Sequence, residues 1–180
     1  MSAQPSLGHL VLVGLPGAGK STVGAAVARR LRRPFLDFDR ELERREGMLV
    51  SALFAERGEE AFRQMEIDLT KQVVGLPPMV LSPGGGWITN PGVLALVRPP
   101  GRIIHLRISP AGALRRMGRG KARRPLLQTD DPKAALDRLW ERRAKLYAQS
   151  DLEIDTEVVG MKRVVEQIVA LARGLDVGLG

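Results

Sequence analysis

Nine residues near the N-terminus have the types and the spacing of a phosphate-binding loop. Segment 14–22 reads GLPGAGKST and matches the pattern G-x-x-x-x-G-K-[ST]. In such loops backbone N–H groups surround a phosphate, the lysine neutralises the β- and γ-phosphates, and the hydroxyl after it binds Mg²⁺. Here Lys20 is that lysine, and Ser21 is the metal-binding hydroxyl. The pattern predicts ATP binding by Gly17, Ala18, Gly19, Lys20, Ser21 and Thr22.

The flanking segments have the patterns that such a loop requires. Leu10–Val13 is a short apolar run that ends at Gly14, as a buried parallel strand would, and apolar residues recur at helical spacing in segment 20–33. The helix would then point its positive end at the bound phosphates. A glycine-rich turn that matches by chance is the alternative, and the strand and helix on either side disfavour it.

Two carboxylates follow the next strand pattern, in segment 34–39. We expect this segment to be a short strand, in which alternation puts Asp37 and Asp39 on the same side. The carboxyl ends of parallel strands meet at the ligand-binding edge of a sheet, so both would face the phosphate loop. One could hold Mg²⁺ and the other could orient or deprotonate an attacking hydroxyl. Alternatively, one of them caps a helix that starts near Arg40.

Segment 40–75 is expected to be helical, with breaks near Gly47 and Gly58. Arg63 lies four residues after Glu59 and three before Glu66. This spacing fits a solvated network of ion pairs on a helix. It also fits an arginine that points into a substrate site, and both readings stay open at this point.

A third strand pattern, at Met79–Leu81, leads to the consecutive glycines Gly84, Gly85 and Gly86. A turn needs one or two glycines, so three suggest a close approach of the backbone to a ligand. A flexible surface hairpin is the alternative. Trp87 follows directly, and its pattern fits either a core residue or a residue that lines the site.

Segment 115–127 combines glycines with six cations and ends in the sequence RPLL. Such a stretch in a nucleotide-binding protein can fold over the phosphates, exclude water and deliver an arginine to the transferring group. We expect a lid over about residues 117–131; a basic loop without that role is the alternative.

Length and composition predict one α/β domain. The chain has 180 residues and no cysteine, which excludes disulfides and thiolate metal sites. Further strand patterns at 101–106 and 152–156 complete five parallel strands flanked by helices, the architecture of a P-loop kinase. A single domain over 1–180 would contain a helical substrate-binding region at about 38–75 and the lid.

The charge balance predicts anionic ligands. There are 28 basic and 20 acidic residues, and most of the basic ones are arginine, which suits phosphate and carboxylate. Nucleic acid is not the expected partner, because the chain has few aromatic residues (2 Trp, 1 Tyr and 4 Phe) and no recognised nucleic-acid motif. No stretch is long and apolar enough to span a membrane, and we expect a cytoplasmic protein.

Taken together, the motifs resemble the shikimate kinase family from Leu10 to about Leu171. The resemblance rests on the order of six motifs, which are the phosphate loop 14–22, Asp37-x-Asp39, Phe62-Arg63-x-x-Glu66, Gly84–Gly86, the RPLL of 124–127 and Arg143-x-x-Leu146-Tyr147. It implies transfer of the ATP γ-phosphate to the 3-hydroxyl of shikimate, with Mg²⁺ as the cofactor and a monomer as the expected state.

The resemblance also implies a role for each site residue. Asp39 would bind the substrate hydroxyls and act as the base, while Asp37 would hold the hydration shell of Mg²⁺. Arg63 and Arg143 would grip the shikimate carboxylate, and the backbone of Gly84–Gly86 would receive the ring hydroxyls. The implied nucleotide contacts are Arg116 near adenine and Arg124 from the lid. Trp87 stands where similar enzymes often carry a small residue, which leaves the identity of the substrate open, with a gluconate kinase as the alternative. A non-catalytic ATP-sensing module is the alternative from a different class of protein.

Overall fold

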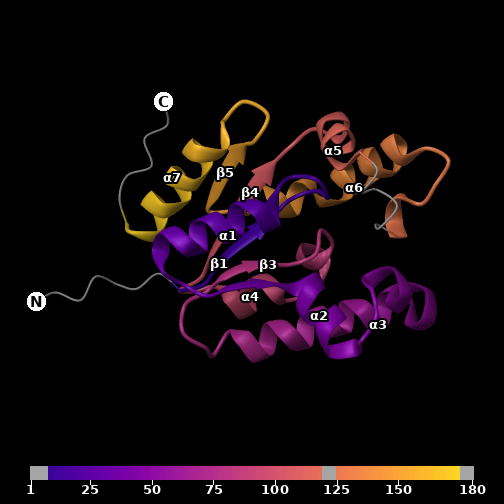
Figure 1. The fold of residues 1–180 in the computed structure, drawn as a ribbon, viewed down its shortest axis with the longest axis horizontal. Coiled ribbons are helices and arrows are strands. Elements are labelled where there is room, and N and C mark those ends of the chain that lie inside the picture. The colour runs from indigo at the N-terminus through magenta and orange to yellow at the C-terminus, as the bar shows by residue number, and fades with distance from the viewer. Residues whose placement is uncertain (1–7, 119–124, 175–180) are drawn as a thin grey trace, which may run out of the picture.

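A five-stranded parallel sheet forms the centre of the molecule in the computed structural model, which describes residues 8–118 and 125–174. The strand order is β2-β3-β1-β4-β5, as drawn in Figure 1. The strands are β1 (Leu10–Val13), β2 (Phe35–Asp37), β3 (Val80–Ser82), β4 (Arg102–Arg107) and β5 (Leu152–Asp155). The predicted fold class is thereby confirmed.

Helices cover both faces of the sheet, with α1 and α7 on one side and α3 and α4 on the other (Figure 1). Their bounds are α1 (Lys20–Leu31), α2 (Phe38–Glu46), α3 (Val50–Val73), α4 (Val93–Val97), α5 (Pro110–Met117), α6 (Pro132–Tyr147) and α7 (Met161–Ala172). Two 3-10 turns, η1 (Trp87–Thr89) and η3 (Pro125–Leu127), lie beside the site. Within the described residues, no helix has both the length and the apolar character of a membrane span.

The central strand β1 divides its side chains between two apolar layers. Leu10 and Leu12 belong to the cluster that includes α1 and α7, whereas Val11 and Val13 pack in the cluster that includes α3 and α4. Successive residues of a strand point to opposite faces, so a run of four apolar residues fits a strand that is covered on both sides. This packing fixes the position at which the phosphate loop leaves the sheet.

The second strand is shorter than the sequence predicts. It ends at Asp37, and α2 begins at Phe38, so Asp39 lies in the first turn of a helix rather than on a strand. The reason is a helix cap, because the Asp37 carboxylate accepts a hydrogen bond from the backbone N–H of Arg40 at 3.3 Å. The alternation argument is therefore wrong for Asp39, and the capping residue is Asp37.

The expected helical region is present, with both of its breaks. Helix α2 ends before Gly47, and α3 is kinked at Gly58, whose φ of 80° and ψ of 170° are not helical. A residue with a side chain is strained at such a φ, so glycine allows the chain to turn there. The kink separates the first two turns of α3 from the part that carries Arg63.

Candidate active site

The carboxyl ends of β1, β2 and β3 open into a cavity of about 560 Å³. The loops after these strands and the end of α5 form its walls. The predicted residues among its lining are Gly17, Gly19, Lys20, Ser21, Thr22, Asp37, Asp39, Gly84, Gly85 and Arg116. Segments far apart in the sequence thus meet at the sheet edge where ligands of open α/β folds bind.

The phosphate loop wraps the start of α1. Gly19 is the N-cap of this helix, and Lys20 is its first residue, so the positive end of the helix dipole faces the cavity. The Lys20 ammonium donates hydrogen bonds to the carbonyls of Gly14 at 2.9 Å and Leu15 at 3.1 Å. The Ala18 side chain is buried in the core and does not line the cavity, and nucleotide binding by this residue of the loop stays a prediction.

Ser21 and Asp37 place two oxygen atoms side by side in the lining of this cavity. The Ser21 hydroxyl donates a hydrogen bond to Oδ2 of Asp37 at 2.5 Å, which joins α1 to the end of β2. No cluster of three or more His, Cys, Asp or Glu that could enclose a metal occurs within residues 8–118 and 125–174. One carboxylate and one hydroxyl nevertheless fit Mg²⁺, which takes its remaining ligands from water and substrate phosphates.

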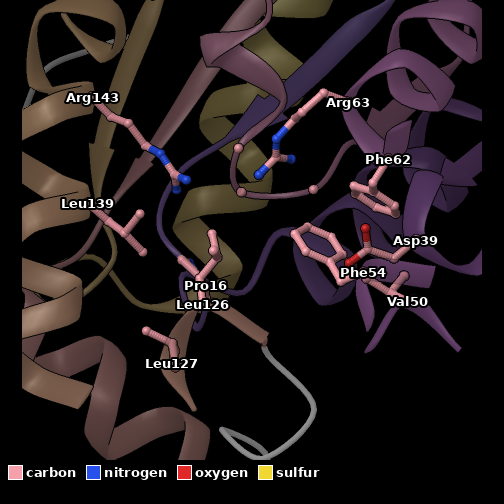
Figure 2. Close-up of a pocket in the computed structure, with 13 residues that line it drawn as sticks. Pro16, Asp39, Val50, Phe54, Phe62, Arg63, Leu126, Leu127, Leu139 and Arg143 are labelled. Atoms are coloured by element: carbon pink, nitrogen blue, oxygen red, sulfur yellow. The ribbon is translucent and has the colours of Figure 1, made fainter. Parts of the chain in front are cut away.

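A second, smaller pocket adjoins the first and is more apolar (Figure 2). Its lining residues are Pro16, Asp39, Val50, Phe54, Phe62, Arg63, Gly84, Gly85, Gly86, Leu126, Leu127, Leu139 and Arg143. Asp39 lines both cavities, as do Gly84 and Gly85. The Asp39 carboxylate therefore stands at the junction of the two spaces.

Two arginines enter the smaller pocket from different helices. Figure 2 shows Arg63, from α3, and Arg143, from α6, pointing toward the same region from opposite sides. Arg143 is buried, and burial lowers the pKa of its guanidinium from the ordinary value, against the opposing effect of Tyr147. Two guanidinium groups that face one space among apolar residues suit a small anion such as a carboxylate.

Arg63 is held by carboxylates on its own helix. Its Nη1 donates to Glu66 at 2.8 Å and its Nη2 donates to Glu59 at 2.9 Å. Burial alone would lower the pKa of Arg63, but these carboxylates raise it above the ordinary value. Arg63 thus forms the predicted ion pairs on its helix and also lines the smaller pocket, while its contact with a substrate stays a prediction. The pair with Glu66 is not solvated, since the two side chains are only 15% and 0% exposed.

Glu66 supports the site through Arg63, a role that the sequence prediction did not assign to it. It is fully buried, and its Oε2 also accepts a hydrogen bond from the Asn90 amide at 3.1 Å. Burial raises the pKa of the Glu66 carboxyl, and Arg63 opposes that rise. The sequence could have indicated this contact, because Glu66 lies three residues after Arg63 on a predicted helix. The spacing predicts that the two side chains meet, but it does not show whether the ion pair is buried.

The glycine segment 84–86 passes directly beside both arginines. A Cβ on Gly86 would lie within 2.6 Å of Nη1 of Arg63, and one on Gly85 would be 3.5 Å from Nη1 of Arg143. The Arg63 side chain leaves no room for a Cβ at position 86, which explains why this residue is a glycine. Trp87, for which the sequence left two possibilities, is buried in the core and does not line either cavity.

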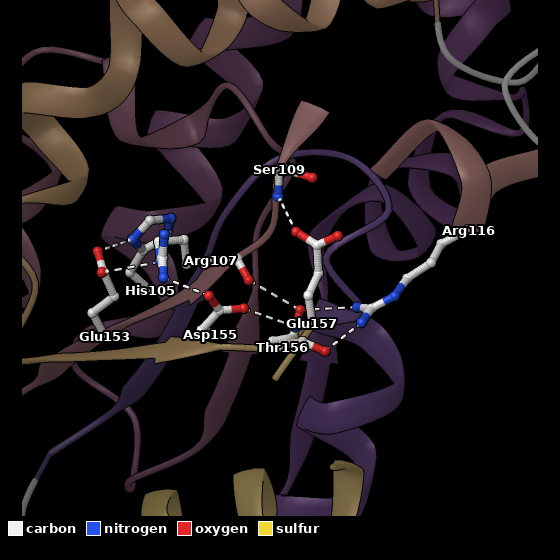
Figure 3. Close-up of polar contacts among 8 residues, drawn as sticks. All are labelled: His105, Arg107, Ser109, Arg116, Glu153, Asp155, Thr156 and Glu157. Carbon is white, nitrogen blue, oxygen red and sulfur yellow. Dashed lines mark hydrogen bonds and ion pairs between the residues drawn. The ribbon is translucent and has the colours of Figure 1, made fainter. Parts of the chain in front are cut away.

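Arg116 closes the far side of the larger cavity. Its Nη1 donates to the hydroxyl of Thr156 at 2.9 Å, and its Nη2 donates to the Thr156 carbonyl (Figure 3). Glu157 then accepts a hydrogen bond from the backbone N–H of Ser109 at 2.7 Å, at the start of α5. The structure thus joins the end of α5, which carries Arg116, to the loop after β5.

Part of the predicted lid, including Arg124, lies outside the described residues. The described part that follows begins with η3, and its Leu126 and Leu127 line the smaller pocket. The start of the segment, Met117, lines the larger cavity. Met117 therefore lines the larger cavity, and Leu126 and Leu127 line the smaller one. The position of Arg124 stays a prediction.

Known proteins resemble this chain in sequence and in structure. A family model described as shikimate kinase matches residues 16–173. Shikimate kinase from Burkholderia thailandensis is 43% identical over 149 residues, which cover 83% of this chain and 80% of that protein. Shikimate kinase from Thermus thermophilus is 38% identical over 160 residues, which cover 89% and 87%. A solved structure of shikimate kinase from Acinetobacter baumannii in complex with shikimate superposes with a TM-score of 0.86 at 34% identity, covering 92% of each chain.

Proposed function

The chain belongs to the shikimate kinase family, and on that basis we propose that it transfers the γ-phosphate of ATP to the 3-hydroxyl of shikimate. The products are ADP and shikimate 3-phosphate. Shikimate is a small polyol with one carboxylate, so its site needs fixed cations for the carboxylate and a base for one hydroxyl. The buried Arg143, the partly buried Arg63 and Asp39 line one pocket and meet that need.

The position of Asp39 is the observation that carries this proposal. Its carboxylate lines both the pocket with the two arginines and the cavity with the phosphate loop. A base that serves phosphoryl transfer has to stand where the acceptor hydroxyl meets the γ-phosphate. We assign Asp39 to that role, in which it takes the hydroxyl proton while the acceptor oxygen bonds to phosphorus and the bond between phosphorus and the β–γ bridging oxygen breaks.

The acceptor is held from two sides in this assignment. Arg63 and Arg143 bind the carboxylate of shikimate, and the backbone of Gly84–Gly86 receives its ring hydroxyls. The apolar residues of the pocket exclude water, which strengthens the charge interactions inside it. Glu66 orients Arg63 through the bond described above and does not itself need to touch the substrate.

On the nucleotide side, the loop amides and Lys20 bind the phosphates and offset the charge that develops during transfer. Bound Mg²⁺, for which Ser21 and Asp37 are the ligand candidates, supplies further charge neutralisation at the phosphates. Arg116 is assigned to the adenine side of the cavity. Arg124 is assigned to ATP, as part of a lid over about residues 117–131.

The remaining expectations concern the setting of the reaction. We propose one domain with its substrate-binding region at about 38–75, a monomer, and a cytoplasmic location. Light scattering of the purified protein with and without substrates measures the oligomeric state directly. Fractionation of cells that produce the tagged protein tests the location.

An ADP-release assay tests the proposed function. The wild-type protein is assayed with ATP, Mg²⁺ and one acceptor at a time, namely shikimate, gluconate or a nucleoside monophosphate. Asp39→Asn removes the base, and Asp68→Asn is the matched control, because Asp68 lies exposed on α3. We expect turnover with shikimate, its loss in Asp39→Asn by at least about 100-fold, and its retention in Asp68→Asn.

Other outcomes separate the alternatives. Turnover with gluconate alone would keep the phosphate chemistry and replace the substrate. ATP binding without turnover of any acceptor would favour the ATP-sensing module. Equal activity of Asp39→Asn and wild type would remove Asp39 from the role of the base.

A further inference from the structure

Trp87 occupies a position that the proposed function does not explain. It follows the glycine segment directly and is buried, with an exposed fraction of 1%. It does not line either of the two cavities. A large, fully buried indole immediately beside a backbone segment of the site is well placed to act through that segment.

The indole makes one specific polar contact. Its Nε1–H donates a hydrogen bond to the Thr70 hydroxyl at 2.8 Å, and Thr70 in turn donates to the backbone carbonyl of Glu66 at 2.7 Å. Thr70 is fully buried on α3, one turn after Glu66. Because a hydroxyl can accept and donate at once, the Thr70 side chain links the indole to the helix backbone beside Glu66.

The backbone around Trp87 is bonded to the glycine segment itself. The Trp87 N–H donates to the Gly84 carbonyl at 3.0 Å, and the Thr89 hydroxyl donates to the Gly86 carbonyl at 2.6 Å. The turn η1 and the glycines therefore form one hydrogen-bonded unit. Any shift of the indole moves this unit relative to α3.

A second link lies one turn away on the same helix. The Asn90 amide donates to Glu66, the carboxylate that also binds Arg63. Segment 84–90 is thus attached to α3 at two points, one of which is shared with the arginine of the pocket. Since the guanidinium of Arg63 lies directly against Gly86, a small change in this spacing changes where the arginine points.

We propose that Trp87 is a positioning residue: its indole N–H, bonded to Thr70, fixes the glycine segment 84–86 against α3 and thereby sets the affinity for the acceptor. The inference rests on the proposed function, because the acceptor is taken to be shikimate. Gly84 and Gly85 also line the larger cavity, but Gly86, which lies against Arg63, lines only the smaller of the two. The phosphate loop itself belongs to a different strand and helix, so we expect the effect on acceptor affinity and not on ATP affinity.

Two variants remove the bond from its two ends. Trp87→Phe removes the donor and keeps an aromatic ring, and Thr70→Val removes the acceptor with little change in volume. Thr70→Ser keeps the hydroxyl and is the conservative rescue. Ile168→Val, in α7 on the other face of the sheet, is a control that loosens the core without touching segment 84–90.

Steady-state kinetics with shikimate and ATP provide the first readout. For Trp87→Phe and for Thr70→Val, we expect the KM for shikimate to rise about tenfold, as the loss of one buried hydrogen bond would give. The KM for ATP stays within about twofold of the wild-type value in both. Thr70→Ser and Ile168→Val keep the wild-type KM for shikimate. In the double variant Trp87→Phe/Thr70→Val, this KM rises no further than in the single variant with the larger rise, because both substitutions remove the same bond.

Two results would overturn the proposal. One is an unchanged KM for shikimate in both single variants, and the other is a parallel rise in both KM values, which marks a general loosening. If the wild-type protein does not phosphorylate shikimate, the proposed function fails. Amide hydrogen exchange without substrate then decides the positioning role, which is supported by faster exchange of 84–90 in Trp87→Phe but not in Ile168→Val and refuted by unchanged exchange.

Discussion

The hydroxyl of Ser21 and the carboxylate of Asp37 are 2.5 Å apart, although they belong to different elements. One residue opens α1 after the phosphate loop, and the other ends β2. The same carboxylate caps α2 through its second oxygen. Asp37 therefore combines a structural bond with a position suited to an oxygen ligand for Mg²⁺.

Asp37→Asn separates these two roles. Asparagine caps a helix about as well as aspartate, so α2 keeps its start and the fold keeps its stability. The amide lacks the negative charge, and we expect the Mg²⁺ concentration for half-maximal activity to rise about tenfold or more. A titration of Mg²⁺ at saturating ATP measures this, with Asp68→Asn as the control. An unchanged Mg²⁺ requirement would exclude Asp37 from the metal site.

Lys20 and Arg63 are expected to affect different kinetic constants. Lys20→Met removes a cation from the transferring phosphate, so kcat should fall about 1000-fold while shikimate binding stays near the wild-type value. Arg63→Gln removes a ligand of the acceptor carboxylate, so the KM for shikimate should rise far more than that for ATP. Calorimetric titration with each substrate complements the kinetics. Equal losses of both affinities in either variant would contradict this division.

Gly86→Ala tests the close approach of the backbone to Arg63. The new methyl group would collide with the guanidinium, which sits at the end of a flexible side chain and has to move. We expect a rise of about tenfold or more in the KM for shikimate, since Arg63 leaves its position beside Glu66. Gly75→Ala is the matched control, because a Cβ there meets no atom within 4 Å. Similar kinetics of the two variants would mean that the contact has no role in binding.

His105 predicts how stability depends on pH. Burial lowers its pKa from the ordinary value of 6.5, against the opposing effect of Glu153, so folding favours the neutral imidazole. Its contribution to stability is present above pH 6.5 and is lost as the pH falls toward the lowered pKa, because the unfolded chain takes up the proton first. We expect the thermal midpoint of the wild-type protein to decrease between pH 6.5 and 5.

His105→Phe should reduce that decrease, since phenylalanine keeps a ring beside Tyr147, with which His105 stacks at 4.3 Å between centroids, but cannot take up a proton. Thermal unfolding of both proteins from pH 8 to 5 measures the difference. His9, whose pKa burial also lowers, accounts for part of the decrease that remains. Parallel curves for the two proteins would assign the pH dependence to other groups.

The sequence predicted the sheet and the strand and helix around the phosphate loop well, because local patterns determine them. Four apolar residues before Gly14 and a helical pattern after Lys20 suffice to place the phosphate loop. The breaks near Gly47 and Gly58 are likewise local and are present. The predicted end of β2 was wrong by two residues. Asp37 and Asp39 have the same side chain, so the sequence does not show which of them caps α2, and the structure shows that it is Asp37.

The acceptor side was harder to predict, because burial decides it. The spacing of Arg63 and Glu66 is the same for a solvated pair and for the buried pair that is present. The contacts of Asn90 and Thr70 join segments 17 to 24 residues apart, and no pattern within either segment indicates them. The core position of Trp87 was open for the same reason, since its neighbours belong to another helix.

The kink at Gly58 turns both parts of α3 toward the same pocket. Val50 and Phe54, before the kink, line it together with Phe62 and Arg63, after the kink. The two parts are in contact, since the ring centroids of Phe54 and Phe62 are 4.7 Å apart and the Arg63 guanidinium lies 5.8 Å from the centroid of the Phe54 ring. A substitution at Phe54 that enlarges the pocket for a bulkier carboxylate would therefore also change the surroundings of the arginine, so shape and charge in this pocket have to be redesigned together.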